Sequence, residues 1–521
     1  MSFELDDSGV VVVVGSGAGG ATVARDLCER GVRVVLLEAG PRIEAAQFRN
    51  DEFFAYQQLT WLDKRIASGD WAAARHAPNA PAWIVKAVGG STVHWNALSF
   101  RVQEREFRSA AEYGGITGAN LADWPIDAAS LEPFYSLAEK RMGVTGTHGI
   151  KPHPPTNNYK VMYNGARRAG YRQISNDRLA INSEPRDGRP GCIQLGFCNQ
   201  GCKIGAKWSS LAVDVPVAER SGNLDLRPES MALQLTVNKK NRIDGVVYAD
   251  RDGRQHKQRA RAICVAGNAI ETPRLLLNSA TSRYPDGLAN ASGQVGRNYM
   301  HHNVAISFGV FEKPVHMNRG ITTPGTVFDE MDHDPRRGFA GGYLMEAVSL
   351  GLPFLSLLAD PAGWGRDYAQ LLDNYENMAG ILLNGEDLPR EGNQVRLHET
   401  EKDQHGLPVP VVHVDEHENE RSMRRHFFAQ AEKIFSAVGA VDVHRTEPAS
   451  ATHNLGTCRM SASADKGVVN QWGQAHEINN LFISDGSQFS TSTCENPTLT
   501  IVALAIRQAG YLADQMARRE I

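Results

Sequence analysis

The fold of this protein is decided by the stretch VVVVVGSGAGGATVARDLCERGVRVVLLEAG, which occupies Val10–Gly40. Val10–Val14 is an unbroken run of β-branched residues, which is typical of a buried strand. A glycine-rich turn follows it, and Ala21–Arg30 has the pattern of a helix that ends at the next glycine. Val32–Leu37 is a second apolar run of strand length. The stretch therefore predicts a strand–helix–strand unit with parallel strands.

Three glycines with the spacing G-x-G-x-x-G, Gly15, Gly17 and Gly20, occupy the turn before this helix. The first permits a tight turn, the second lets the backbone approach a pyrophosphate, and the third lets the helix pack closely on the strand. Glu38 ends the second strand, where a carboxylate accepts hydrogen bonds from ribose hydroxyls. We therefore predict a dinucleotide site rather than a glycine-rich turn without a ligand. The acidic Glu38 disfavours NADP, and the stretch alone leaves NAD and FAD open.

The composition is that of a globular protein with two or more packed domains, since the chain has 521 residues of which 42% are hydrophobic and 22% charged. The 55 Lys and Arg residues against 59 Asp and Glu residues give a net charge of −4, which argues against a nucleic-acid or anionic-membrane binder. No apolar run is long enough to span a bilayer. The acidic start MSFELDDSG lacks the basic region of a secretory signal. We therefore expect a cytoplasmic protein, or a periplasmic one only if a signal-bearing partner exports it.

The rest of the chain predicts a mixture of strands and helices with no internal repeat or flexible linker. Asn223–Gly267 has short alternating runs separated by polar turns, which is typical of an antiparallel β-meander. Beyond it we expect the helices Glu271–Ser279, Arg421–Val438 and Thr498–Met516, and the strands Asn393–His398, Pro410–Val414 and Asn480–Asp485. This arrangement favours interleaved domains over domains in series.

Two C-terminal blocks carry polar residues in a pattern typical of a reactive site. The first is THNLGTCRM, residues 452–460, and the second joins Asp485–Ser487 to Asn496–Thr500. With the glycine motif, Glu38, and the segments VGGS (88–91), WP (124–125) and GRNYM (296–300), these blocks resemble the glucose–methanol–choline (GMC) flavoprotein oxidoreductases. They occur in the family's order over nearly the whole chain. The resemblance is specific for the family and says little about the substrate.

The resemblance implies an α/β fold in which a Rossmann-type FAD-binding domain of discontinuous segments, with a β-meander, is joined to an α+β substrate domain with a mostly antiparallel sheet. It assigns residues 1–110, 205–304 and 450–521 to the FAD-binding domain, and residues 111–204 and 305–449 to the substrate-binding domain and cap. Within the second set, Ala305–Val438 is expected to cover the flavin.

The resemblance also implies a catalytic pair, because in this family the histidine of H-x-x-G-T-x-R-M and the asparagine of N-P-T-x-T face the flavin N5. Here these residues are His453 and Asn496. An alcohol gives up a carbon-bound hydride only as its hydroxyl proton leaves, and a histidine with a pKa near ~6.5 can take that proton at neutral pH. The amide donates a hydrogen bond to the developing alkoxide. Many relatives have a second histidine in place of Asn496, and the His/Asn pair resembles sugar-oxidising branches such as pyranose oxidases.

His94, in the segment GGSTVHWN (89–96), is similar to the histidine through which several family members bind flavin covalently. The alternative is a histidine that packs beside the ring and hydrogen-bonds to it. The other FAD-binding residues that the resemblance implies are Gly15, Gly17, Gly20, Glu38, Gly89, Gly90, Ser91, Asn96, Asp485, Pro497 and Thr498.

The seven cysteines are too few, and odd in number, for a disulfide framework. Cys192, Cys198 and Cys202 have a spacing that resembles a segment of quinone- or cytochrome-linked sugar dehydrogenases, in which three cysteines hold a [3Fe–4S] cluster. The family's proline after the last cysteine is replaced by Lys203. Iron–sulfur ligands, a zinc-type or redox thiol role, and buried structural thiols remain open.

We therefore expect FAD-dependent oxidation of an alcohol CH–OH group, of a sugar, glycoside or polyol, by hydride transfer to flavin N5. Electrons would pass to a quinone, a cytochrome or another acceptor, with a small or cytochrome subunit as a partner and no nucleic acid. An oxidase that uses oxygen on sugars or aromatic primary alcohols is the alternative. The rival classes are a redox-silent FAD-binding structural subunit and an NAD-dependent dehydrogenase.

Overall fold

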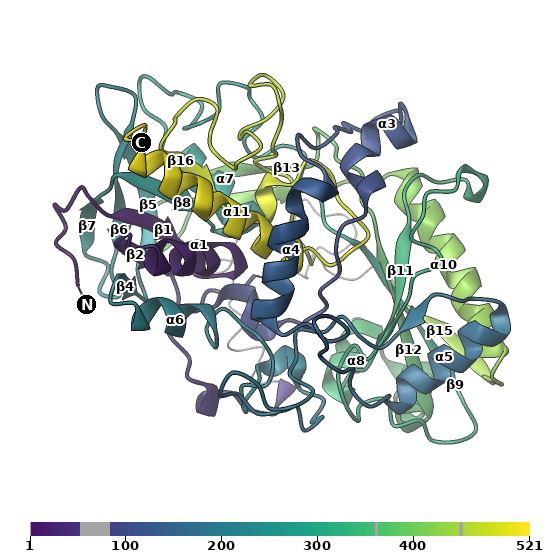
Figure 1. The fold of residues 1–521 in the computed structure, drawn as a ribbon. Helices are drawn as coiled ribbons and strands as arrows, with labels where there is room; N and C mark the ends of the chain where they lie inside the picture. The colour runs from purple at the N-terminus through teal and green to yellow at the C-terminus, as the bar shows by residue number, and fades with distance from the viewer. Residues whose placement is uncertain (1, 53–83, 360–362, 447–451) are drawn as a thin grey trace.

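A computed structural model describes residues 2–52, 84–359, 363–446 and 452–521. Two large β-sheets lie toward opposite ends of the molecule, and both chain termini lie beside the parallel one (Figure 1). Helices cover the sheets, and a smaller meander and a long hairpin complete the fold. The predicted α/β class, with one parallel and one antiparallel sheet, is confirmed.

The parallel sheet has the strand order β16-β8-β1-β2-β4 and is completely buried along its centre. Val11 pairs with Val34 on one side and with Ala262 on the other, so β1 is a central strand. Apolar side chains on both faces of such a strand are expected when helices or other layers cover both faces. Its strands are β16 (Leu481–Ile483), β8 (Ala262–Val265), β1 (Val11–Val14), β2 (Val34–Leu37) and β4 (Leu224–Arg227).

Helices α1 (Ala18–Glu29) and α11 (Thr498–Ala517) lie side by side beside the parallel sheet (Figure 1). Helix α4 (Ala128–Met142) packs on α11, and α6 (Asp214–Arg220) packs on α1. The two ends of the chain are thus in direct contact. This contact brings the N-terminal glycine motif next to the C-terminal blocks.

Only the middle of the expected meander is a meander. Strands β5 (Met231–Val237), β6 (Ile243–Ala249) and β7 (Gln255–Arg259) form the antiparallel sheet, whereas β4 and β8 at the two ends of Asn223–Gly267 join the parallel sheet. The prediction failed at β4 because its alternating sequence is typical of either kind of strand, and a distant partner, β2, decides between them.

The second sheet has the order β15-β9-β12-β11-β10-β3, and each of its pairings is antiparallel. Helices α5 (Asn157–Ala169) and α10 (Glu418–Ser436) pack together and on this sheet. The strands are β15 (Asp442–Arg445), β9 (Asn303–Val310), β12 (Met378–Gly385), β11 (Tyr343–Val348), β10 (Thr326–Val327) and β3 (Ile174–Ser175).

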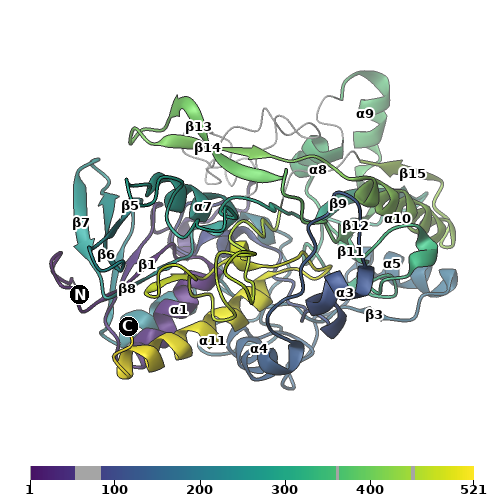
Figure 2. The same cartoon turned by 90° about the horizontal axis from the view of Figure 1, so that it is seen from above.

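The hairpin of β13 (Gln394–Lys402) and β14 (Pro408–His413) extends along one side of the molecule and packs on α7 (Asn268–Asn278) (Figure 2). The other α-helices in the described residues are α3 (Ser109–Tyr113), α8 (Leu352–Ala359) and α9 (Gly365–Asp373). In the described part of the chain, no helix has the length and apolar character needed to cross a membrane.

The expected local elements are present with shifted ends. Helix α1 begins at Ala18 rather than at Ala21, and so it includes Gly19 and Gly20. An added Cβ at Gly19 would lie 1.5 Å from the carbonyl oxygen of Ser484, and one at Gly20 would lie 1.9 Å from that of Gly15. The first helical turn therefore consists of glycine because two backbone segments pass against it.

Replacing Gly20 by alanine should destabilise the fold more than the same change at Gly17. At Gly17, φ is −67° and an added Cβ meets no described atom within 4 Å. We expect G20A to lower the free energy of unfolding by about 1–3 kcal/mol or more, the usual range for a forced overpacking, and G17A by less. Thermal unfolding of the two variants measures the difference. Equal losses of unfolding free energy in the two variants would contradict the conclusion that backbone contacts require glycine at position 20.

Candidate active site

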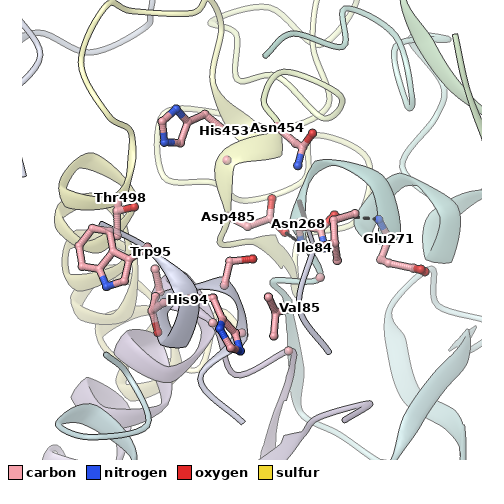
Figure 3. A pocket seen from close by; sticks show the side chains of 18 of the residues that line it. Ile84, Val85, His94, Trp95, Asn268, Glu271, His453, Asn454, Asp485 and Thr498 are labelled. Carbon is pink, nitrogen blue, oxygen red and sulfur yellow. Dashed lines mark hydrogen bonds between the residues drawn. The ribbon is translucent and has the colours of Figure 1, made fainter. Parts of the chain in front are cut away.

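A cavity of about 380 Å³ lies between the parallel sheet and the antiparallel sheet. Its walls come from segments far apart in the sequence, including the glycine motif, the 84–98 segment, β11 and the two C-terminal blocks. Figure 3 shows His453 and His94 reaching this cavity from different walls. The cavity therefore joins the expected dinucleotide site to the expected catalytic pair.

The dinucleotide end is organised by Glu38, whose carboxylate is held by the glycine-rich loop. Ser16 donates to Glu38 Oε2 from its backbone nitrogen at 3.0 Å and from its hydroxyl at 2.6 Å. The Gly40 N–H donates to Oε1 at 3.0 Å. Burial raises the pKa of the Glu38 carboxyl above its usual value, while these hydrogen bonds oppose the rise. Glu38 is thus fixed at the end of β2, where the sequence places the ribose site.

The Gly89–Asn96 segment lies against the glycine motif. Gly89 has φ of 102° and Gly90 has φ of 52°, and an added Cβ at Gly90 would lie 2.9 Å from Gly17 Cα. The Gly89 N–H donates to the Ser16 hydroxyl at 3.0 Å. Gly90, Ser91 and Asn96 line the cavity, whereas Gly20 and Gly89 lie behind the lining and shape the loops.

His94 has one ring nitrogen bonded and the other free. It ends the short helix η3 (Gly90–His94), and its Nδ1 donates to the Asn199 carbonyl at 2.8 Å. Nε2 is buried and has no hydrogen-bond partner among the described residues. Burial lowers the pKa of His94 to about 4, so the ring is neutral near pH 7. Its Nε2 consequently carries a lone pair in the cavity wall.

His453 and Asn496 both line the cavity, on different segments. His453 adopts a left-handed backbone conformation with φ of 57°, which is uncommon for a residue other than glycine. Burial, and the nearby His302 and His301 rings, lower the pKa of His453 well below its ordinary value. Asn496 precedes α11, and its Oδ1 is buried without a described partner.

Asp485, Pro497 and Thr498 complete the wall next to this pair. Asp485 accepts hydrogen bonds from the Asn268 N–H at 2.9 Å and from the Thr272 hydroxyl at 2.5 Å. It thereby ties β16 to the start of α7. Thr498 begins α11, so the N-terminus of that helix forms part of the cavity wall.

A family model described as GMC oxidoreductase matches residues 11–304, and a second one with the same description matches residues 389–505. The chain belongs to the GMC oxidoreductase family. Enzymes of this family oxidise alcohols with FAD, and this GMC oxidoreductase is accordingly an FAD-dependent enzyme.

The chain is 31% identical over 536 residues to 2-methyl-1,2-propanediol dehydrogenase of Mycolicibacterium austroafricanum, covering 96% of this chain and 95% of the relative. It is 30% identical over 542 residues to the fructose dehydrogenase large subunit of Gluconobacter japonicus, covering 97% of this chain and 98% of the relative. Among solved structures, pyridoxine 4-oxidase from Mesorbium loti aligns with a TM-score of 0.63 at 17% identity, over 97% of this chain and 99% of that one. The last similarity supports the fold.

The residues of this GMC oxidoreductase fit FAD. The loop before α1 leaves space at Gly17, Glu38 is fixed beside it, and the cavity continues from there to His453. The unpartnered Nε2 of His94 lies in the same lining. An orphaned buried nitrogen needs an explanation, and contact with a cofactor supplies one.

The cysteine segment contacts the segment that carries His94. Cys198 begins the short helix η5 (Cys198–Gln200), whose Asn199 accepts the His94 hydrogen bond. The buried Lys207 ammonium donates to the carbonyls of Trp95 at 2.7 Å and Cys198 at 2.6 Å, so it joins the two segments. The three cysteines do not line the cavity, but Cys198 directly precedes Asn199, which does.

The three cysteine thiols are free and only partly buried. The N–H of Gln194 donates to Cys192 Sγ at 3.3 Å, and the N–H of Lys207 donates to Cys202 Sγ at 3.4 Å. Among the described residues, the one group of three metal-ligand types whose ligand atoms lie within 4.8 Å of one another is Glu106, Cys494 and Glu495. The three sulfurs are therefore not packed as around a single tetrahedral ion.

Two residues were missed from the sequence, one in the cavity lining and one hydrogen-bonded to His453. Glu346 on β11 lines the cavity, and one of its carboxyl oxygens is buried without a described partner. His302, just before β9, is hydrogen-bonded through Nδ1 to His453 Nδ1 at 2.6 Å. The position of His302, two residues after the end of the GRNYM block and next to His301, was a usable signal. Nothing in the sequence around Glu346 distinguishes it from a core strand position.

Burial raises the pKa of Glu346 to about 8, although the nearby Asn496 side chain favours its charged form. The carboxyl therefore holds its proton more tightly in the folded protein than in the unfolded chain, where the ordinary value is 4.5. The stability that this proton contributes is complete below about 4.5 and is lost as the pH rises through about 8.

The E346Q variant should consequently gain thermal stability relative to the unmodified protein as the pH rises from 5 to 8. The expected slope is roughly 1.4 kcal/mol per pH unit at most. Melting temperatures across that range measure it. E418Q is the control, because arginine hydrogen bonds lower the pKa of the exposed Glu418 to about 2, below the tested range. A constant difference for E346Q would mean that Glu346 is already charged.

Proposed function

We propose that this enzyme oxidises a CH–OH group of a sugar, glycoside or polyol and passes the electrons to a quinone, a cytochrome or another acceptor rather than mainly to oxygen. FAD, when bound in the cavity, supplies the acceptor for the hydride. The proposal is supported by the cavity in which His453 and Asn496 meet the expected FAD-binding residues. The names of the two relatives, a diol dehydrogenase and a sugar dehydrogenase, support the substrate class and the dehydrogenase activity.

The observation that carries the proposal is that His453 lines the cavity and makes its hydrogen bond to the protein through Nδ1, not through Nε2. Its Nδ1 is engaged with His302, and no hydrogen bond to Nε2 is formed by the described residues. Because burial keeps the ring neutral near pH 7, Nε2 is available to take the hydroxyl proton of an alcohol. A positioned base of this kind is typically worth about 10²–10⁴ in rate.

Asn496 and Glu346 act on the developing alkoxide. We assign the Asn496 amide as the hydrogen-bond donor to it, without competition for the proton. The Asn496 side chain lies close enough to Glu346 to favour the charged form of its carboxyl. Burial outweighs this effect and keeps the carboxyl protonated near pH 7. A neutral carboxyl places no negative charge beside the oxygen that becomes negative, so proton removal is not opposed.

His94 is proposed to hold FAD covalently through Nε2. Its hydrogen bond to Asn199 fixes the ring with Nδ1 protonated, which leaves Nε2 as the nucleophilic nitrogen. Ionisation does not remove this lone pair at neutral pH, because burial lowers the pKa of His94 to about 4. Non-covalent packing beside the ring is the alternative reading.

Cys192, Cys198 and Cys202 are proposed to hold a [3Fe–4S] cluster that receives electrons from the flavin. Backbone N–H groups already donate to two of the sulfurs, as they do for cluster thiolates, where such bonds tune the potential. A cluster of several irons also spaces its thiolates more widely than a single ion. The hydrogen bond between His94 and Asn199 joins this segment to the one proposed to bind the flavin, which supports electron transfer between them. Ile193 and Leu195 are exposed there, at 61% and 48%, and offer an apolar face for a small or cytochrome subunit.

Replacing His453 by alanine should slow anaerobic flavin reduction by at least about 10²-fold while flavin stays bound, because the base is lost. Stopped-flow reduction with sugars, glycosides, polyols and benzylic alcohols measures the rate and identifies the substrate class. H256A is the matched control, since His256 lies on the meander, paired with Asp250, outside the cavity lining. Full-speed reduction in H453A would remove His453 from the mechanism. Rapid reoxidation of the flavin by oxygen would favour the oxidase alternative. If no alcohol reduced the flavin, the result would favour the redox-silent subunit.

Acid precipitation of the purified protein should leave flavin on the polypeptide, and H94A should release it. The same preparation should contain iron with the electron paramagnetic resonance signal of a [3Fe–4S] cluster, and C198S should lose the iron but keep the flavin. A colourless pellet would exclude the covalent link. Absence of iron from protein prepared without oxygen would leave the thiols as structural or redox-active groups.

A further inference from the structure

The histidine pair formed by the buried His302 and the half-buried His453 is a feature that the catalytic pair alone does not explain. His302 is 1% exposed, and its ring meets that of His453 edge to face, with ring centres 4.7 Å apart. The Nδ1 atoms of the two rings are 2.6 Å apart. The other nitrogen of His302, Nε2, lies 2.5 Å from the Thr493 carbonyl oxygen. His302 is therefore bonded at both nitrogens.

These contacts determine where the hydrogens are. A carbonyl oxygen only accepts, so His302 Nε2 must carry a proton and donate to Thr493. Burial lowers the pKa of His302 to about 4, so the ring is neutral near pH 7 and its Nδ1 has a lone pair. The short contact between the rings is then a hydrogen bond only if His453 Nδ1 donates to His302 Nδ1.

We propose that His302 is a positioning residue that fixes His453 in the tautomer with the proton on Nδ1 and the lone pair on Nε2, the nitrogen available to the substrate. This inference rests on the proposed role of His453 as the base. In the other tautomer, Nε2 would carry a proton and could not accept one, while the two Nδ1 lone pairs would face each other. His302 thus excludes the inactive form of the base.

The proton balance of the step follows from the same contacts. The hydroxyl O–H bond breaks, and its proton forms a bond with His453 Nε2. The resulting imidazolium keeps its Nδ1–H donated to His302. His302 cannot pass a proton further, because its Nε2–H ends on the Thr493 carbonyl. The proton therefore stays on His453, and His302 orients the ring without acting as a relay.

The contact with Thr493 has a second consequence. Thr493 lies shortly before Asn496 on the same segment, which enters α11. His302 consequently links the segment of the hydrogen-bond donor to the ring of the base. The left-handed backbone of His453 gives this ring an uncommon direction, and the bond to His302 holds it there.

Two variants separate the acceptor function of His302 from its donor function. In H302N, the side-chain oxygen stands near the former Nδ1 and can accept from His453, but the side chain is too short for Thr493. In H302Q, the longer amide can reach the Thr493 carbonyl, but no acceptor remains at the Nδ1 position. Both variants are neutral and polar. They therefore differ in which of the two hydrogen bonds of His302 is kept, and only H302N keeps the one that fixes the tautomer of His453.

We expect anaerobic flavin reduction to slow by about tenfold or more in H302Q, a part of what the whole base is worth, with little change in the substrate concentration at half-saturation. H302N should stay within about threefold of the unmodified enzyme. Flavin content and melting temperature are measured in parallel. Equal loss in both variants, or unchanged reduction in H302Q, would overturn the proposal.

A double variant tests whether His302 acts through His453. The H302Q change should add nothing to H453A, because a fixed tautomer has no meaning without the ring. Multiplied losses would show an independent structural role and would overturn the inference. A fast H453A variant would instead contradict the proposed base itself. A slow H453A with a fast H302Q would overturn the tautomer assignment alone.

A direct readout of the tautomer is independent of turnover. In protein labelled with ¹⁵N-histidine, the signals that disappear in H453A belong to this ring. They should have the shifts of one protonated and one unprotonated nitrogen in the unmodified enzyme and in H302N. Averaged shifts should appear in H302Q. Averaged shifts already present in the unmodified enzyme would overturn the assignment.

Discussion

The site depends on the close approach of the first turn of α1 to the chain that leaves β16. An added Cβ at Gly19 would lie 1.5 Å from the Ser484 carbonyl oxygen, so only glycine allows the two segments to touch. Asp485 follows Ser484 directly, and α11 packs along α1. This single contact therefore brings the glycine motif, which is fixed to Glu38, against the C-terminal blocks that carry His453 and Asn496.

The antiparallel sheet contributes the neutral polar groups of the cavity. His302 comes from the approach to β9 and Glu346 comes from β11, and burial disfavours the charged form of each. Charges left unpaired in such a place would be costly, whereas neutral rings and acids form hydrogen bonds with one another. The result is a candidate base whose Nε2 has no hydrogen-bond partner among the described residues, in the same cavity as the Glu346 carboxyl, which burial keeps neutral near pH 7. That combination suits the removal of a proton from an alcohol.

Local sequence patterns predicted the elements whose partners lie close in the chain. The strand–helix–strand unit was correct because its apolar periods and glycines are all within Val10–Gly40. The start of α1 was missed because glycine is a weak helix former, and distant backbone contacts require it there. The pairing of β4 was missed because alternation does not identify the neighbour of a strand. The two C-terminal blocks predicted the family and the residues that line the cavity together, but not their hydrogen bonds.

The sequence by itself determined the glycine motif with Glu38, because the spacing of that motif has a local physical meaning. It also determined the resemblance to the GMC family, and that resemblance identified the candidate base and its amide partner. Only the tertiary structure decided which nitrogen of His453 is free. That choice depends on His302, 151 residues away in the sequence, and on the Thr493 carbonyl, 191 residues from His302. Hydrogen bonds between such distant positions produce no periodicity, so folding alone brings these groups together.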